Sequence, residues 1–197
     1  METVNLIVAG VGGQGSVLGA HIIADAAVRA GLNARVGDTY GAAQRGGKVA
    51  SHVRIGPDVE SPLVPEKGAV AVLGLELLEG LRNVVKYLKA GGIAVISTYE
   101  FPPIDASLAD LQYPKREEVE EVVRAIASKA FFLDLIQMAK EAGNVRTANV
   151  VGIGTLYGLG VLPFDLEYLE EAIKENVPRG TEEVNLRALR IGMEAVR

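Results

Sequence analysis

Short apolar segments alternate with longer amphipathic stretches through the first 135 residues of the chain. The short segments predict strands at residues 4–9, 33–36, 69–73, 93–96 and 130–133, because such runs are typical of strands buried on both faces. Apolar side chains at helical spacing predict helices at residues 16–30, 75–88 and 117–129. This alternation indicates an α/β fold with an open, mostly parallel sheet and helices on both faces.

Two of these segments lead to more specific expectations about which side chains are buried. In residues 49–55, Ala50, His52 and Arg54 fall on one side of the strand and mainly apolar side chains on the other. We therefore expect a strand near an edge of the sheet, with His52 on its wetter face. In the helix at 117–129, the inward positions are predicted to be Val119, Val122, Val123 and Ile126.

The last third of the chain has a helical pattern, which predicts a helical C-terminal segment. The expected helices lie at residues 134–143, 147–159, 165–175 and 181–196. Residues 147–164 carry no charge. The length of this run is close to the lower limit of a membrane span, but the run includes four glycines. We expect a buried, closely packed helix there and no membrane association. Residues 1–197 are expected to form a single domain.

Two glycine-rich segments carry the most specific chemical signal. Gly10-Val11-Gly12-Gly13-Gln14-Gly15 lies between a predicted strand and a predicted helix, where backbone N–H groups and the helix N-terminus favour an anion. About thirty residues later, Gly41-Ala42-Ala43-Gln44-Arg45-Gly46-Gly47-Lys48 adds two cations. We predict that the two segments share one crevice for a phosphate-bearing ligand or a partner chain. Its predicted binding residues are Gly10, Gly12, Gly13, Gln14, Gly15, Gln44, Arg45, Gly46, Gly47 and Lys48.

The first segment also satisfies the G-x-G-x-x-G pattern of dinucleotide-binding proteins. That interpretation requires an acidic residue about twenty positions further on, at the end of the second strand, to bind a ribose hydroxyl. Arg35 occupies that position, and the nearest acid is Asp38. A stand-alone dinucleotide-binding oxidoreductase is therefore an alternative hypothesis, and a non-catalytic docking module is another.

Neither the second segment nor the histidines indicate catalysis by this chain alone. The second segment departs from the triphosphate-binding loop G-x-x-x-x-G-K-[ST], because an extra glycine follows Gly46 and Val49 replaces the magnesium-binding hydroxyl. ATP hydrolysis is therefore not expected. His21 and His52 have no ordered carboxylate companions in the sequence, and both are interpreted as structural. We predict no catalytic residue and no metal site in this chain.

Composition narrows the function classes further. A hydrophobic share of 49% and a charged share of 23% are ordinary for a globular protein, and the net charge of −5 argues against general nucleic-acid binding. The chain has no cysteine, which excludes thiol catalysis and cysteine-held zinc or iron–sulfur clusters and fits the reducing cytoplasm. The first Lys or Arg is Arg29, so a signal peptide is not expected.

The two glycine segments, the Ala-rich stretch up to Gly31 and the sequence from Tyr40 to Gly56 together resemble one family. This family comprises the gamma subunits, or gamma domains, of the 2-oxoacid:ferredoxin oxidoreductases. Within it, Gln44-Arg45-Gly46-Gly47 followed by Ser51-His52-Val53-Arg54 is most similar to the small (beta) subunit of the indolepyruvate type. Asn149-Val-Val-Gly-Ile-Gly and Asn185-Leu-Arg-Ala-Leu extend the resemblance over essentially the whole chain.

The resemblance implies an accessory subunit of a heteromeric complex. Such complexes decarboxylate a 2-oxoacid on thiamine diphosphate, pass electrons through iron–sulfur clusters to ferredoxin and form an acyl-CoA. Thiamine diphosphate and the clusters would belong to a large partner subunit. This chain would cap the active site and help to bind CoA, with Arg45 pairing with a phosphate or orienting an acidic group. The sequence departs from the indolepyruvate type at Ala42, so pyruvate, branched-chain 2-oxoacids and 2-oxoglutarate stay open as substrates beside aryl pyruvates.

Overall fold

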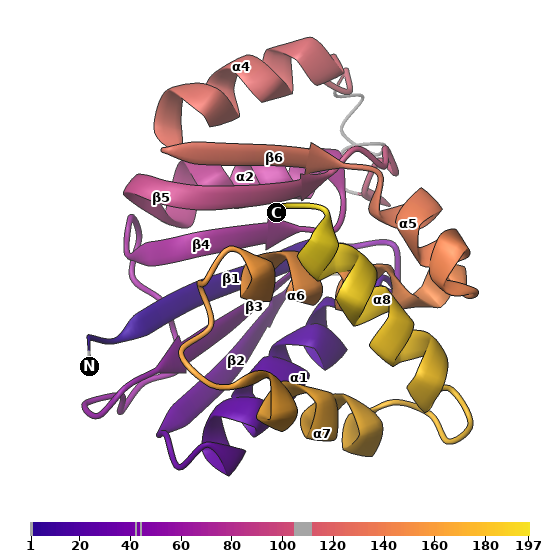
Figure 1. Cartoon of the computed structure of the whole chain (residues 1–197). Helices are drawn as coiled ribbons and strands as arrows, with labels where there is room; N and C mark the ends of the chain where they lie inside the picture. The colour runs from indigo at the N-terminus through magenta and orange to yellow at the C-terminus, as the bar shows by residue number, and fades with distance from the viewer. Residues whose placement is uncertain (1, 42, 44, 105–111) are drawn as a thin grey trace.

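The computed structural model describes residues 2–41, 43, 45–104 and 112–197, and its centre is a six-stranded sheet (Figure 1). The strand order is β2-β3-β1-β4-β5-β6. Neighbouring strands from β1 through β4 and β5 to β6 are parallel, whereas β3 is antiparallel to both β1 and β2. The strands are β1 (Val4–Val11), β2 (Ala34–Tyr40), β3 (Lys48–Ile55), β4 (Ala69–Gly74), β5 (Leu88–Ser97) and β6 (Lys129–Leu133).

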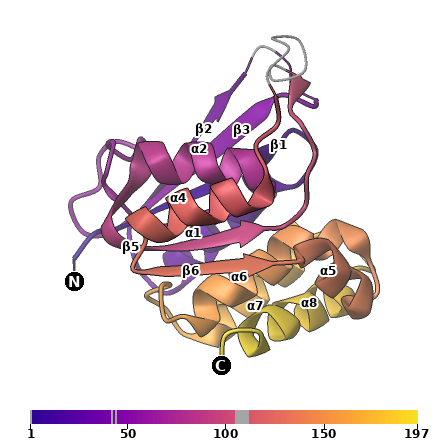
Figure 2. The ribbon, with the colours of Figure 1, turned by 90° about the horizontal axis from the view of Figure 1, so that it is seen from above.

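Helices cover both faces of this sheet, and the C-terminal segment is helical (Figures 1 and 2). On one face lie α2 (Leu77–Tyr87) and α4 (Arg116–Ile126). The other face is covered by α1 (Ser16–Arg29), α5 (Leu135–Ala142), α6 (Ala148–Gly158), α7 (Leu166–Asn176) and α8 (Glu182–Glu194), with the 3-10 turn η1 (Val145–Thr147) before α6. The predicted α/β class, mostly parallel sheet and helical C-terminal segment are confirmed.

The hydrophobic core consists of two layers that share β1. Leu6 and Val8 pack into the layer beneath α1 and α6, whereas Ile7 and Ala9 pack into the layer beneath α2. Successive side chains of a strand point to opposite faces, so a strand with helices on both sides must be apolar at every position. This arrangement explains the continuous apolar run in β1.

The uncharged run at residues 147–164 contains α6, a helix of 11 residues that is buried along most of its length. Gly154 of α6 and Gly192 of α8 lie where these two helices meet. An added Cβ at either glycine would come within 2.1 Å of backbone atoms of the opposite helix. The predicted buried, closely packed helix is therefore confirmed. Within the described ranges, no helix has both the length and the apolar character that a membrane crossing requires.

The structure corrects two expectations about burial. β3 lies next to the edge strand β2, as expected, but His52 is not on a wet face, because it is only 1% exposed. The segment that follows β3 folds back over this face, and the Val64 N–H donates to His52 Nδ1 (3.1 Å). Val122 was expected to face inward, but its side chain is 42% exposed, since α4 buries only the stripe of Val119 and Val123.

Candidate functional site

The first glycine segment forms a tight turn between β1 and α1. The Gln14 N–H donates to the Val11 carbonyl (3.0 Å), and the Val11 N–H donates to Gln14 Oε1 (2.7 Å), so this side chain closes the turn. Gly13 (φ 110°) and Gly15 (φ 82°) adopt left-handed conformations that favour glycine. Gly15 is the N-cap of α1, which directs the first N–H groups of that helix toward the end of the sheet.

The second glycine segment lies directly against the first. The β1–β3 ladder ends with Val11 opposite Lys48 and is continued by two hydrogen bonds, from the Gly12 N–H to the Gly47 carbonyl (2.8 Å) and from the Gly46 N–H to the Gly12 carbonyl (3.3 Å). The predicted proximity of the two segments is therefore observed. Gln44 lies outside the described residues.

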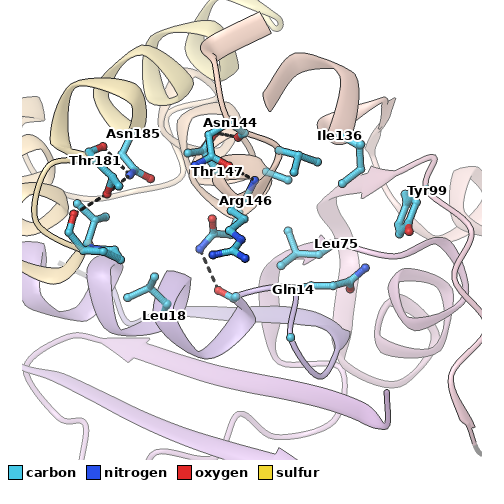
Figure 3. A pocket seen from close by; sticks show the side chains of 17 residues that line it. Gln14, Leu18, Leu75, Tyr99, Ile136, Asn144, Arg146, Thr147, Thr181 and Asn185 are labelled. Atoms are coloured by element: carbon cyan, nitrogen blue, oxygen red, sulfur yellow. Dashed lines mark hydrogen bonds between the residues drawn. The ribbon is translucent and has the colours of Figure 1, made fainter. Parts of the chain in front are cut away.

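A cavity of about 690 Å³ opens at the carboxyl ends of the parallel strands (Figure 3). Its walls come from the first glycine turn, the segments after β4 and β5, and the starts of α6 and α8. Ligands commonly bind at this edge in open α/β sheets, and the volume falls within the usual range of ligand sites. Gly13, Gln14 and Gly15 line the cavity, whereas Arg45, Gly46, Gly47 and Lys48 do not.

The guanidinium that lines this cavity belongs to Arg146 in η1. In Figure 3 its side chain extends toward the first glycine turn. The Arg146 backbone N–H donates to Asn144 Oδ1 (3.0 Å), which fixes the turn that carries it. Within the described part of the chain no carboxylate forms a salt bridge with Arg146 or with Arg45.

Helix N-termini surround the polar half of the cavity. Asn149 in the first turn of α6 donates from Nδ2 to the Gly15 carbonyl (3.1 Å), which joins the starts of α1 and α6. Thr181, the N-cap of α8, and Asn185 in its first turn form the third side and are hydrogen-bonded to each other (Figure 3). The positive ends of three helices thus add to the Arg146 charge and favour an anionic ligand.

The other half of the cavity is apolar. Leu75 follows β4, Tyr99 follows β5, and Ile136 lies in α5; all three side chains line the wall away from Asn185 (Figure 3). A ligand of this cavity would therefore combine an anionic group with an uncharged part.

Sequence reasoning missed Arg146 as a site residue, because no motif marks it. Its only signal is its position as the last charge before the uncharged run at residues 147–164. Asn149 contributed to the family resemblance, but its contact with the first glycine turn could not be read from the sequence. The two positions are 134 residues apart, and the sequence pattern specifies no contact across that distance.

The geometry of a dinucleotide-binding fold is not formed here. In that fold the acid that holds the ribose lies on the strand beside the glycine turn's own strand. Here β3 lies between β1 and β2, so Asp38 is two strands away from the turn, roughly 10 Å in the sheet plane. Asp38 Oδ1 accepts a hydrogen bond from Ser51 (2.5 Å), and its Oδ2 lies 3.9 Å from His21 Nε2. The expectation that His21 has no carboxylate companion is therefore wrong.

His52 has the structural role expected of it, although it is buried. Nδ1 accepts the Val64 N–H, and the ring meets Tyr87 edge to face at 5.0 Å between centroids. Burial lowers the pKa of His52, and the nearby Lys86 charge lowers it further. The imidazole is therefore neutral near pH 7. Over the described ranges, no group of three or more acidic or histidine side chains is placed to hold a metal ion.

Comparison with known proteins identifies the family. Residues 5–195 match the family described as pyruvate ferredoxin/flavodoxin oxidoreductase. The chain belongs to this family. It is 40% identical over 188 residues to the indolepyruvate oxidoreductase subunit IorB of Archaeoglobus fulgidus, which covers 95% of this chain and 92% of that protein.

Solved structures of this family share the fold. The gamma subunit of a keto/oxoacid ferredoxin oxidoreductase from Geobacter sulfurreducens has 27% identity and a TM-score of 0.69, with 98% of both chains covered. The 2-oxoglutarate:ferredoxin oxidoreductase of Magnetococcus marinus has 20% identity and a TM-score of 0.73, and this chain matches 31% of that longer one. The resemblance stated from the glycine segments is confirmed, as is the prediction of a subunit of an oxidoreductase complex.

Proposed function

We propose that this chain is the small subunit of a cytoplasmic 2-oxoacid:ferredoxin oxidoreductase that acts on an aryl 2-oxoacid such as indolepyruvate. The similarity to a subunit named for indolepyruvate, over nearly the full length of both chains, supports this substrate. The chain has no cysteine to ligate an iron–sulfur cluster. A large partner subunit would therefore carry the clusters and thiamine diphosphate, and electrons would reach ferredoxin through that subunit.

Within this complex, we propose that the chain caps the shared active site and helps to bind CoA. The observation that carries this step is the two-sided cavity at the first glycine turn. Arg146 and the N–H groups at the start of α1 would hold a phosphate of CoA. Leu75, Tyr99 and Ile136 would contact its uncharged arm. CoA supplies the thiol that accepts the acyl group, while the residues of this chain bind and orient it.

Kinetics of the reconstituted complex test the role of Arg146. Arg146→Gln should raise the KM for CoA about tenfold and leave kcat nearly unchanged, because it removes a charge-assisted contact made equally before and during the reaction. Arg45→Gln is the matched variant, since Arg45 is the cation that the sequence pattern favoured but does not line the cavity. A KM unchanged in the Arg146 variant and raised in the Arg45 variant would move the CoA site to the second glycine segment.

Two further measurements test the subunit role and the substrate. The complex should oxidise indolepyruvate with a higher kcat/KM than pyruvate or 2-oxoglutarate. Preference for either of the latter would leave the subunit role intact and replace the substrate. A large subunit that is fully active alone and does not associate with this chain would contradict the proposal itself.

A further inference from the structure

Behind the apolar wall of the cavity at the first glycine turn lies a buried carboxylate. Leu75 and Tyr99 line that wall and come from two different strands, since Leu75 follows β4 and Tyr99 follows β5 (Figure 3). Glu76 directly follows Leu75, is the N-cap of α2 and has no exposed surface. It does not line the cavity, and the proposed function gives it no role.

Glutamate is not among the residues that usually cap a helix. The preferred N-cap residues are Ser, Thr, Asp and Asn, whose short side chains accept an N–H group of the first helical turn. Glu76 makes this contact through Oε2, which accepts the Glu79 N–H (2.7 Å). A shorter residue would make the same contact, and burying a carboxylate is costly unless its oxygens are hydrogen-bonded. The extra length of Glu76 therefore has another use.

The second carboxylate oxygen shows what that use is. Oε1 of Glu76 accepts the Phe101 N–H (3.3 Å) and the hydroxyl of Tyr113. The N–H of Leu77, the first residue of α2, donates to the Tyr99 carbonyl (3.0 Å). The start of α2 thus holds the segment after β5 at two alternate positions, and one of these carries the ring that faces the cavity.

Phe101 in turn supports that ring. The rings of Tyr99 and Phe101 are stacked, with 6.2 Å between their centroids and an interplanar angle of 6°. Both side chains are partly exposed, so packing on the core fixes them only in part. The remaining constraint comes from backbone hydrogen bonds: the Tyr99 N–H donates to Ser97 Oγ (3.2 Å), and the Phe101 N–H is held by Glu76.

We propose that Glu76 is a positioning residue for the uncharged arm of CoA. It acts through Phe101 and Tyr99, which it holds in the cavity wall, and touches no ligand itself. This inference rests on the proposed function, in which the uncharged arm lies against Tyr99 and a phosphate lies at Arg146. When the contact from Glu76 is lost, the arm should bind less tightly while the phosphate keeps its own contacts.

Glu76→Asp in the reconstituted complex separates the two contacts of this side chain. Aspartate is a preferred N-cap residue and can still accept the Glu79 N–H, but it is one methylene shorter and does not reach Phe101 as well. Isothermal titration calorimetry compares CoA with adenosine 3′,5′-bisphosphate, which carries phosphates but lacks the uncharged arm. The Kd of CoA should rise about fivefold, as for one lost hydrogen bond, and the Kd of the bisphosphate should not change.

A double-mutant cycle tests the route through Tyr99. Tyr99→Ala should weaken CoA, and adding Glu76→Asp to it should cause no further loss, because the ring that Glu76 positions is then absent. Tyr113→Phe is the matched control. It removes the other hydrogen bond to Oε1 and leaves the Phe101 contact in place, so its Kd for CoA should equal that of the wild type.

Equal losses of CoA and bisphosphate affinity in Glu76→Asp would overturn the inference, since they would indicate a general distortion of the fold. An unchanged Kd for CoA in this variant, with Arg146→Gln and Tyr99→Ala both weakened, would overturn the inference and leave the proposed function intact. CoA affinity that responds to neither Arg146→Gln nor Tyr99→Ala would overturn the CoA site itself. Glu76→Ser, which also caps a helix, is the second variant and should show the same selective loss of CoA.

Discussion

At the scale of single residues, Gly15 shows most directly how the sequence specifies the site. Its left-handed φ of 82° allows the chain to turn from β1 into α1, and the missing side chain leaves room for Asn149. An added Cβ would lie 2.8 Å from Asn149 Nδ2, the atom that donates to the Gly15 carbonyl. The sequence pattern predicts the turn, but the partner that requires the space could not be predicted from it.

Gly15→Ala should therefore lower the free energy of unfolding by about 2–3 kcal/mol, from left-handed strain together with the displaced Asn149. Gly31→Ala is the matched control, because Gly31 also has a positive φ (76°) but nothing lies within 4 Å of an added Cβ. That variant should lose about 1 kcal/mol from strain alone. Urea denaturation measures both values, and equal losses would show that the Asn149 contact adds nothing.

At the scale of elements, the sequence predicted most helices and strands to within a few residues, but it did not predict which strands pair with β3. Periodicity shows that residues 49–55 alternate; it does not show that β3 runs antiparallel between β1 and β2. The same limit applies to α2. Its apolar stripe predicted a helix, whereas the buried Glu76 at its N-cap became visible only in the structure.

Glu76 links the start of α2 to the segment after β5. Oε2 accepts the Glu79 N–H (2.7 Å), and Oε1 accepts the Phe101 N–H (3.3 Å) and the hydroxyl of Tyr113. Burial, followed by the hydrogen bond to Glu76, raises the pKa of the Tyr113 phenol, which therefore stays protonated as the donor. Three donors thus depend on one buried carboxylate.

Glu76→Ala should lower the free energy of unfolding by about 3 kcal/mol or more, because buried donors are left without an acceptor and α2 loses its cap. Tyr113→Phe removes only one of these bonds and should lose about 1 kcal/mol. Thermal and urea unfolding of the two variants give the comparison. A Tyr113 variant as unstable as the Glu76 variant would show that the phenol, and not the cap, stabilises this region.

At the scale of the whole molecule, the sequence predicted the α/β class and the position of both glycine segments at one edge of the sheet. It did not predict the cavity at the first glycine turn. The cavity needs α5, α6 and α8 to fold back over the carboxyl ends of the strands, and the hydrogen bond from Asn149 in α6 to Gly15 joins residues 134 positions apart. The same long-range packing buries His52 between β3, the segment containing Val64 and α2. Its protonation therefore affects the stability of the whole fold.

The folded protein lowers the pKa of His52 from 6.5, mainly by burial, so the unfolded chain binds this proton more readily. Stability from this group is complete above about pH 6.5 and decreases as the pH falls from there toward the pKa in the fold. The decrease should reach up to about 1.4 kcal/mol per pH unit. In His52→Asn, whose side-chain oxygen can still accept the Val64 N–H, this part of the pH dependence should disappear. Urea unfolding at pH 7.5, 6.5 and 5.5 provides the test, and parallel curves for both proteins would contradict it.

Gly12 is hydrogen-bonded to both Gly46 and Gly47, so the two glycine bends move together. A displacement of one bend must stretch the hydrogen bonds to the other, so a ligand in the cavity beside α1 would also displace residues 46–47. Occupancy of this cavity should therefore alter the exchange rate of the Gly12 amide hydrogen, which is donated to the Gly47 carbonyl.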